Sequence, residues 1–207
     1  MTEKCVKGYI VASIIEGVRG AVYEERIDRD QVEVVLGSHA ALLDEKIDPL
    51  RWYPVELLEG LNRLLAMARG GDQRTAMLEL GAEQFELLSA MGVHQQLTFS
   101  GGEVNESSPK EIASWGRLVS TMMRSVYSFS RASFEADPAA PGRYTLDWRG
   151  IEGLGDIVLE STLGFMTALA RRSAGPDARV TLERPTPGHA RYLFEGARSS
   201  GLVRPRG

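Results

Sequence analysis

Three histidines and one cysteine are the side chains best suited to metal or nucleophilic chemistry. His39, His94 and His189 lie far apart, and no pair has the spacing of a zinc-binding HExxH helix. Cys5 has no second cysteine with which to form a disulfide or a thiolate metal site. The sequence also contains no Gly-x-Ser-x-Gly elbow, Walker loop or dinucleotide loop. We therefore expect no catalytic site, no metal site and no cofactor, and we predict that the protein is not an enzyme.

Large apolar side chains suggest binding rather than catalysis. Trp52, Tyr53, Trp115, Met122 and Met166 are candidates for the wall of an apolar ligand cavity. Aromatic rings supply large apolar surfaces, and methionine fills irregular space. The alternative is that the same side chains are ordinary members of a hydrophobic core.

The composition is that of a globular protein. The chain has 207 residues, of which 43% are hydrophobic and 25% are charged, enough to bury a substantial core. A net charge of −4 disfavours nucleic-acid binding. The segment 1–5 does not resemble the start of a signal peptide, and the apolar stretches are too short to span a bilayer. We expect a cytoplasmic protein without a membrane span.

The first part of the chain is predicted to be mainly helical. Residues 6–24 fit either a helix or a buried strand, because the 3–4 spacing of their apolar residues competes with a high content of β-branched residues. Pro49 and Pro54 predict an extended segment that contains Trp52 and Tyr53, with both rings buried against the helices. Apolar periodicity, caps and glycine stops predict further helices over 30–36, 57–68, 73–91 and from 109 to about 126, and a loop over 93–107.

The last part of the chain changes to alternating strands. Two hairpins, 129–148 and 179–195, flank a helix over 156–172, and we predict that they form one antiparallel sheet covered on one face by that helix. The fold class is therefore α+β. We expect one domain over 1–207, with a helical part at about 6–127, an α/β part at about 128–196 and a tail at 197–207.

Several motifs resemble a paralogous family of unknown function found in myxobacteria. The run from Ile47 to Leu57 resembles its Trp-Tyr-Pro motif, and Val6-Lys7-Gly8 resembles its first segment. Gly70-Gly71-Asp72 with Glu79-Leu80-Gly81, the helix centred on Gly164 and the aromatic strand with Tyr192 and Phe194 are similar to later parts of the family. The resemblance covers about 6–195. His189 departs from the family, which often has a cysteine before the aromatic strand.

More distantly, the chain is similar to the fold shared by haem-based nitric-oxide sensors, vinyl-reductase-type ligand domains and Bet3-like vesicle-tethering subunits. The resemblance implies a cavity between sheet and helices. In the haem-binding relatives, an axial histidine precedes a Tyr-x-Ser-x-Arg motif that holds the propionates. His94, Tyr127 and Arg131 match these positions, but Phe129 replaces the serine. Because this removes a hydrogen-bond donor, we expect no haem binding.

These observations predict a non-enzymatic sensor or small-molecule-binding signalling domain with an apolar cavity between helices and sheet. The alternative is a protein-interaction adaptor that acts through an exposed helix face without a ligand. The partners expected are an apolar small molecule, and either a second copy of the chain in a homodimer or a signalling protein.

Overall fold

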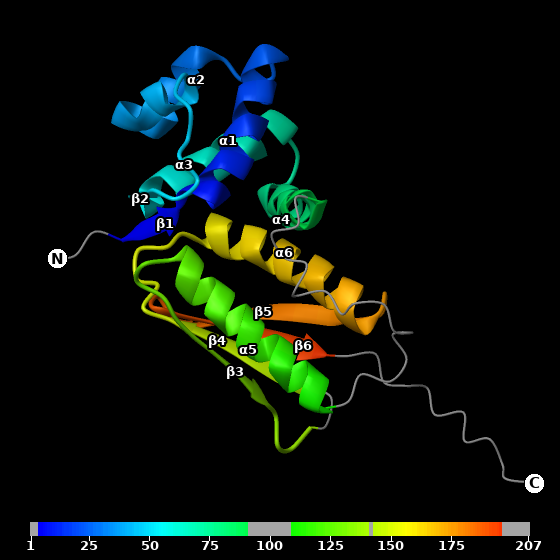
Figure 1. The fold of residues 1–207 in the computed structure, drawn as a ribbon. Helices are drawn as coiled ribbons and strands as arrows, with labels where there is room; N and C mark the ends of the chain where they lie inside the picture. The colour runs from blue at the N-terminus through cyan, green and yellow to red at the C-terminus, as the bar shows by residue number, and fades with distance from the viewer. Residues whose placement is uncertain (1–3, 91–108, 141–142, 196–207) are drawn as a thin grey trace, which may run out of the picture.

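The computed structural model describes residues 4–90, 109–140 and 143–195, with side chains except those of 109–115 and 173–174. Helices and short strands come first, and hairpins flanking a helix follow (Figure 1). The elements are β1 (Cys5–Lys7), α1 (Gly8–Tyr23), α2 (Arg29–Leu36), the 3-10 helix η1 (Gly37–Leu43), β2 (Trp52–Pro54), α3 (Val55–Arg69), α4 (Gln73–Ala90), α5 (Pro109–Val126), β3 (Arg131–Ala136), β4 (Arg143–Arg149), α6 (Asp156–Ala174), β5 (Arg179–Thr186) and β6 (His189–Glu195).

Both predicted structures of the first segment occur, one after the other: residues 5–7 form β1, and α1 begins at Gly8. β1 pairs antiparallel with β2 and opposes Val6 to Tyr53. The loop before β2 satisfies the free N–H groups of α1, because Gly8 N donates to Arg51 O at 2.8 Å and Tyr9 N donates to Pro49 O at 3.0 Å. Strand pairing and helix capping thus fix the start of the helical layer.

The two predicted hairpins form one antiparallel sheet in the order β3-β4-β6-β5, which confirms the expected topology. Alternate residues of β4 and β6 are buried, so one face of the sheet carries the core side chains. The fully buried Trp148 lies opposite Ala132 of β3 and Ala190 of β6. These two small neighbours leave room for the indole ring.

Helices α5 and α6 cover this core face of the sheet (Figure 1). α6 contacts β5 and β6, as predicted, and α5 contacts β3. Phe134 of β3 fills the space above Gly116 of α5, where a Cβ atom would lie 1.8 Å from the ring. The sequence placed α5 in the helical part; in the structure this helix lies against the sheet.

Helix α4 joins the helical layer to the sheet layer by crossing α6. The helices meet at glycines: a Cβ on Gly81 would lie 1.9 Å from Ser161 O, and one on Gly164 would lie 2.1 Å from Leu78 O. The backbones therefore touch directly. Buried side chains from both layers form one continuous cluster around this junction. Among the described residues, no helix has the length and apolar character needed to cross a bilayer.

Candidate functional site

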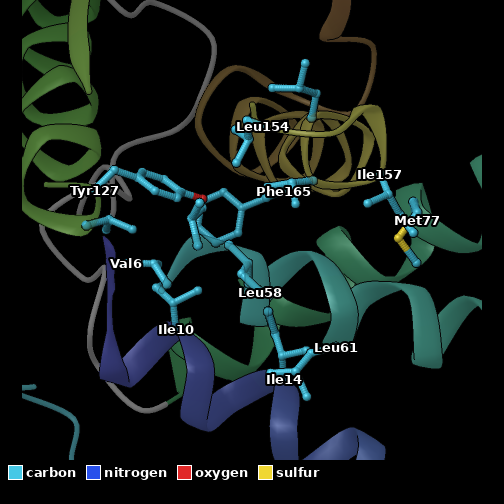
Figure 2. Packing of buried hydrophobic residues seen from close by; sticks show 14 of the residues in the cluster. Val6, Ile10, Ile14, Leu58, Leu61, Met77, Tyr127, Leu154, Ile157 and Phe165 are labelled. Atoms are coloured by element: carbon cyan, nitrogen blue, oxygen red, sulfur yellow. The ribbon is translucent and has the colours of Figure 1, made fainter. Parts of the chain in front are cut away.

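Tyr127 lies where the helical layer, the sheet and the end of α5 meet. Val6 of β1 pairs with it in an isolated antiparallel bridge, and Ser128 N donates to Cys5 O at 3.0 Å. Figure 2 shows the Tyr127 side chain reaching from the end of α5 into the core, with Val6 and Leu58 on the helical side and Leu154 on the α6 side. The ring is buried, and its centroid lies 4.9 Å from that of Trp148.

Hydroxyl groups surround this position in an otherwise apolar region. The hydroxyl groups of Tyr127 and of Tyr192 on β6 both lie close to that of Thr162 on α6. Thr162 Oγ1 donates to Val158 O at 2.8 Å, while the Tyr192 hydroxyl donates to Leu159 O at 3.2 Å. We call Tyr9, Tyr127, Trp148, Thr162 and Tyr192 the junction site.

The junction site is uncharged. Burial raises the pKa of the Tyr127 hydroxyl, and the bond to Thr162 only partly opposes this effect. Burial likewise raises the pKa of Tyr192, and that of Tyr9, whose hydroxyl bonds to Ser125 of α5. All three phenols therefore remain protonated at neutral pH. They can donate or accept hydrogen bonds but cannot supply a phenolate nucleophile.

The Trp148 side chain adds a donor without a partner. Its Nε1 is buried and has no hydrogen-bond acceptor among the described residues. Buried indole N–H groups normally find a partner, because leaving one unmade costs about 1–3 kcal/mol. The Trp148 N–H is therefore a buried donor that the described residues leave unused.

The structure corrects one of the two predictions for the Trp-Tyr-Pro segment. Tyr53 is buried, and its hydroxyl accepts a hydrogen bond from Asp48 N at 3.0 Å. Trp52, expected to be buried, is 39% exposed and lies under Lys7, with Nζ 4.1 Å from the ring centroid. Successive strand residues face opposite sides, so only one ring can enter the core. Neither residue belongs to the junction site.

The other proposed cavity residues come from two helices. Met166 of α6 is fully buried, and Met122 of α5 is half-buried against the same core. The side chain of Trp115 lies outside the described residues. The junction site is therefore largely different from the set chosen from the sequence.

The residues matching the haem motif do not converge in this structure. Tyr127 faces the core, whereas Arg131 is exposed and begins β3 on the face turned away from the helices. Phe129, at the serine position, packs on Tyr127 with ring centroids 5.7 Å apart. His94 lies outside the described residues. Tyr127 and Arg131 therefore do not fit a shared role in holding haem propionates.

The motifs of the resembling family hold the fold together. Lys7 and Trp52 are Cα partners in the β1–β2 pairing, and Gly8 must be glycine because a Cβ atom would lie 2.0 Å from Asp48 O. Gly81 and Gly164 form the crossing of α4 with α6. Within the described part of the chain, no group of three or more histidine, cysteine or carboxylate side chains is placed to hold a metal ion.

Sequence reasoning missed most of the junction site. Trp148 was recognisable as a large aromatic ring that could line a pocket or anchor the core, Tyr192 as part of an aromatic strand, and Thr162 only as one residue on the buried side of a helix. Nothing local indicates that Thr162 meets Tyr127. The one available signal was the density of hydroxyl-bearing residues among apolar positions that face the core.

Comparison with known proteins identifies a similar fold but does not assign the chain to a family. No family model matches the chain, and no curated protein matches it. Among solved structures, the Fe(II) unliganded H-NOX protein from K. algicida is similar with a TM-score of 0.60 and 13% identity, over 93% of this chain and 97% of that one. An oxygen-binding H-NOX domain related to soluble guanylate cyclases, in its oxygen complex, gives a TM-score of 0.57 and 15% identity, over 93% and 95%. The distant similarity to the haem-based sensor fold is therefore confirmed: the chain has an H-NOX-like fold.

Proposed function

We propose that this protein is a non-enzymatic sensor domain that binds a small, largely apolar molecule between the helical layer and the sheet. The fold supports a sensor function, because an oxygen-binding H-NOX domain shares it. The junction site supports the location, because side chains from α1, α6, β4 and β6 meet there around Tyr127.

The observation that carries the proposal is the unpartnered Nε1 of Trp148. A ligand with a carbonyl, ether or hydroxyl oxygen would accept this hydrogen bond and remove the cost of burying the donor. The neutral phenols favour an uncharged ligand, since a charge buried here would have no counterion. Haem is not the ligand we propose, because Tyr127 and Arg131 lie on different sides of the sheet.

A protein-interaction adaptor remains the second candidate. Tyr23 at the end of α1 is 90% exposed, and Val34 of α2 is 84% exposed. Exposed apolar side chains on helices can form the contact with a partner protein. This function requires no ligand at the junction site.

Native mass spectrometry of the purified full chain separates the two functions. We expect a bound molecule to appear as mass in excess of the chain. Trp148→Phe keeps an aromatic ring but removes the N–H donor together with part of the indole ring system, so it should abolish the excess mass. Trp52→Phe makes the same change at a half-exposed ring outside the site and should retain it.

Two results would contradict the ligand proposal. The first is excess mass that persists unchanged in Trp148→Phe. The second is wild-type protein that carries no excess mass and shows no rise in melting temperature with any member of a library of uncharged apolar compounds. A mass equal to two chains with no added ligand would favour the adaptor function.

A further inference from the structure

The sheet face turned away from α5 and α6 carries a row of basic side chains across three strands. Arg131 of β3 lies opposite Arg149 of β4, and Arg149 lies opposite His189 of β6. Directly opposed residues in an antiparallel pair have Cα atoms about 4.5–5.5 Å apart, and their side chains share a face. We call Arg131, Arg149 and His189 the basic row.

The composition of this row is unfavourable without a ligand. Like charges directly opposite each other destabilise a strand pair. Neither guanidinium of Arg131 and Arg149 has a hydrogen bond or ion pair among the described residues. By contrast, Arg143 at the other end of β4 bonds to Glu195 at 2.7 Å. The sheet therefore neutralises a basic residue at one end and leaves two uncompensated at the other.

The nearby carboxylates are already engaged. Asp147, in the adjacent row, bonds to His189 Nε2 and accepts from Arg191 Nε at 3.1 Å. Glu152 forms an ion pair with Lys4 at 3.2 Å. Glu183 of β5 lies opposite Arg191 on the same face but forms no ion pair among the described residues. The guanidinium of Arg149 therefore has no carboxylate partner among the described residues, and the carboxylate of Asp147 is taken up by His189 and Arg191.

A hollow of about 460 Å³ lies over this end of the sheet. It is lined by Arg149, Glu152, Thr186, His189 and Arg191, together with Gly150 and Gly188, whereas Arg131 lies opposite Arg149 outside this lining. The volume lies within the range of small-molecule sites, about 300–1,000 Å³. The carboxylate of Glu152 lies over Gly188, where a Cβ atom would be 2.3 Å from its Oε1, and its charge is paired with Lys4.

We propose that this hollow binds a phosphate group, held by Arg149, with Arg131 opposite it on β3 as a second cation and with His189 and Thr186 as further hydrogen-bonding groups. Guanidinium groups match phosphate oxygens with two parallel hydrogen bonds, and a phosphate monoester supplies the negative charge that the basic row lacks. The group belongs either to a small phosphorylated molecule or to a phosphorylated protein side chain. The site is on the opposite face of the sheet from the junction site and does not depend on it.

Isothermal titration of the full chain at low ionic strength tests the proposal. The probes are phenyl phosphate, a phosphoserine peptide and the same peptide without phosphate. We expect the phosphorylated probes to bind and the unphosphorylated peptide not to bind. Tighter binding of phenyl phosphate assigns the site to small molecules, and tighter binding of the phosphopeptide assigns it to a modified protein.

Variants that each remove one positive charge, at different positions, distinguish a specific binding site from nonspecific electrostatic attraction. Arg149→Gln and Arg131→Gln should each raise the dissociation constant at least about tenfold, because each removes a charge-assisted contact. Arg143→Gln removes the same charge from the same face at its neutralised end and should leave binding unchanged. If Arg149→Gln does not fold, Arg131→Gln carries the test.

The proposal is overturned if neither phosphorylated probe binds the wild-type protein. It is also overturned if Arg143→Gln weakens binding as much as Arg149→Gln, because the attraction would then be nonspecific. A melting temperature measured without ligand provides an independent check. Removing one of two opposed arginines should not lower it, whereas a purely structural role for Arg149 would.

Discussion

Single residues in this protein combine tight packing with unused hydrogen-bonding capacity. Trp148 lies between Ala132 and Ala190 on neighbouring strands, so its ring is enclosed without steric conflict. The same enclosure removes its N–H from water without providing an acceptor among the described residues. Phenylalanine is smaller than the indole and would leave part of this space unfilled. The indole therefore fills the site, while its N–H remains without an acceptor among the described residues.

Haem binding can be tested at the same scale. We predict that protein expressed with a haem precursor shows no Soret band after gel filtration. Phe129 provides no hydrogen-bond donor, and Arg131 points away from the face on which Tyr127 is buried. A Soret band that survives gel filtration and disappears in His94→Ala would contradict this prediction. It would then favour a gas sensor.

Asp147 makes stability depend on pH. Burial raises the pKa of its carboxyl group, but hydrogen bonds from His189 and Arg191 outweigh burial and lower the pKa below its ordinary value of 3.8. A lowered pKa in the folded state contributes stability that is fully present above the ordinary value and is lost as pH falls through the folded-state value.

Asp147→Asn should therefore destabilise the protein most near neutral pH. The difference from wild type in free energy of unfolding, measured by urea titration, should shrink as pH falls below 3.8. Glu135→Gln, on the exposed side of β3, gives the same change in net charge and serves as the control. A difference for Asp147→Asn that stays constant with pH would show that the carboxyl contributes through shape alone.

At the scale of whole elements, the crossing of α4 and α6 depends on two glycines. No side chain separates the helices at Gly81 and Gly164, and the carbonyl oxygens of Ser161 and Leu78 occupy the positions that Cβ atoms would take. Any larger residue must push the helices apart. Such overpacking typically costs about 1–3 kcal/mol.

We predict that Gly164→Ala lowers the free energy of unfolding by at least this amount, about 1–3 kcal/mol. Gly20→Ala in α1 is the matched control, because a Cβ atom there meets nothing within 4 Å. That control should be neutral or should stabilise by up to about 1 kcal/mol, since alanine favours helix. Equal urea midpoints for Gly164→Ala and wild type would refute the close crossing.

The sequence predicted the elements better than their partners. Apolar spacing and the Asp72 cap indicated α3 and α4, and alternation with turn residues indicated the strands, because these signals are local. The pairing of α4 with α6 joins segments far apart in the chain, and a glycine in a helix does not indicate which helix it meets. Trp52 was misplaced because strand alternation allows either neighbouring ring to face the core.

The whole molecule has one core that extends through both layers. The cluster of buried side chains runs from Val6 and Leu58 in the helical layer to Leu146 and Tyr192 in the sheet. Figure 2 shows Tyr127 between the helical-layer residues Val6 and Leu58 and the α6-side residue Leu154. Because neither layer buries its apolar surface alone, we expect both to unfold together.

A single cooperative transition is the prediction at this scale. In the variant Trp52→Phe/Trp115→Phe, fluorescence reports on Trp148 in the sheet, while far-UV circular dichroism reports on the helices of both layers. The two urea curves should coincide. Separate midpoints would mean that residues 1–207 contain two independently stable units.

The crossing of α4 and α6 at Gly81 and Gly164 also affects how these two helices can move. With no side chain at the closest approach, no rotamer change can absorb a displacement of α4, so we expect α6 to move together with α4. The first turn of α6 carries Asp156, which bonds to Arg184 of β5, and Arg184 Nη2 also donates to Pro187 O at 3.1 Å. These contacts connect the first turn of α6 to the turn that carries Gly188, so we expect a displacement of α6 to be felt there.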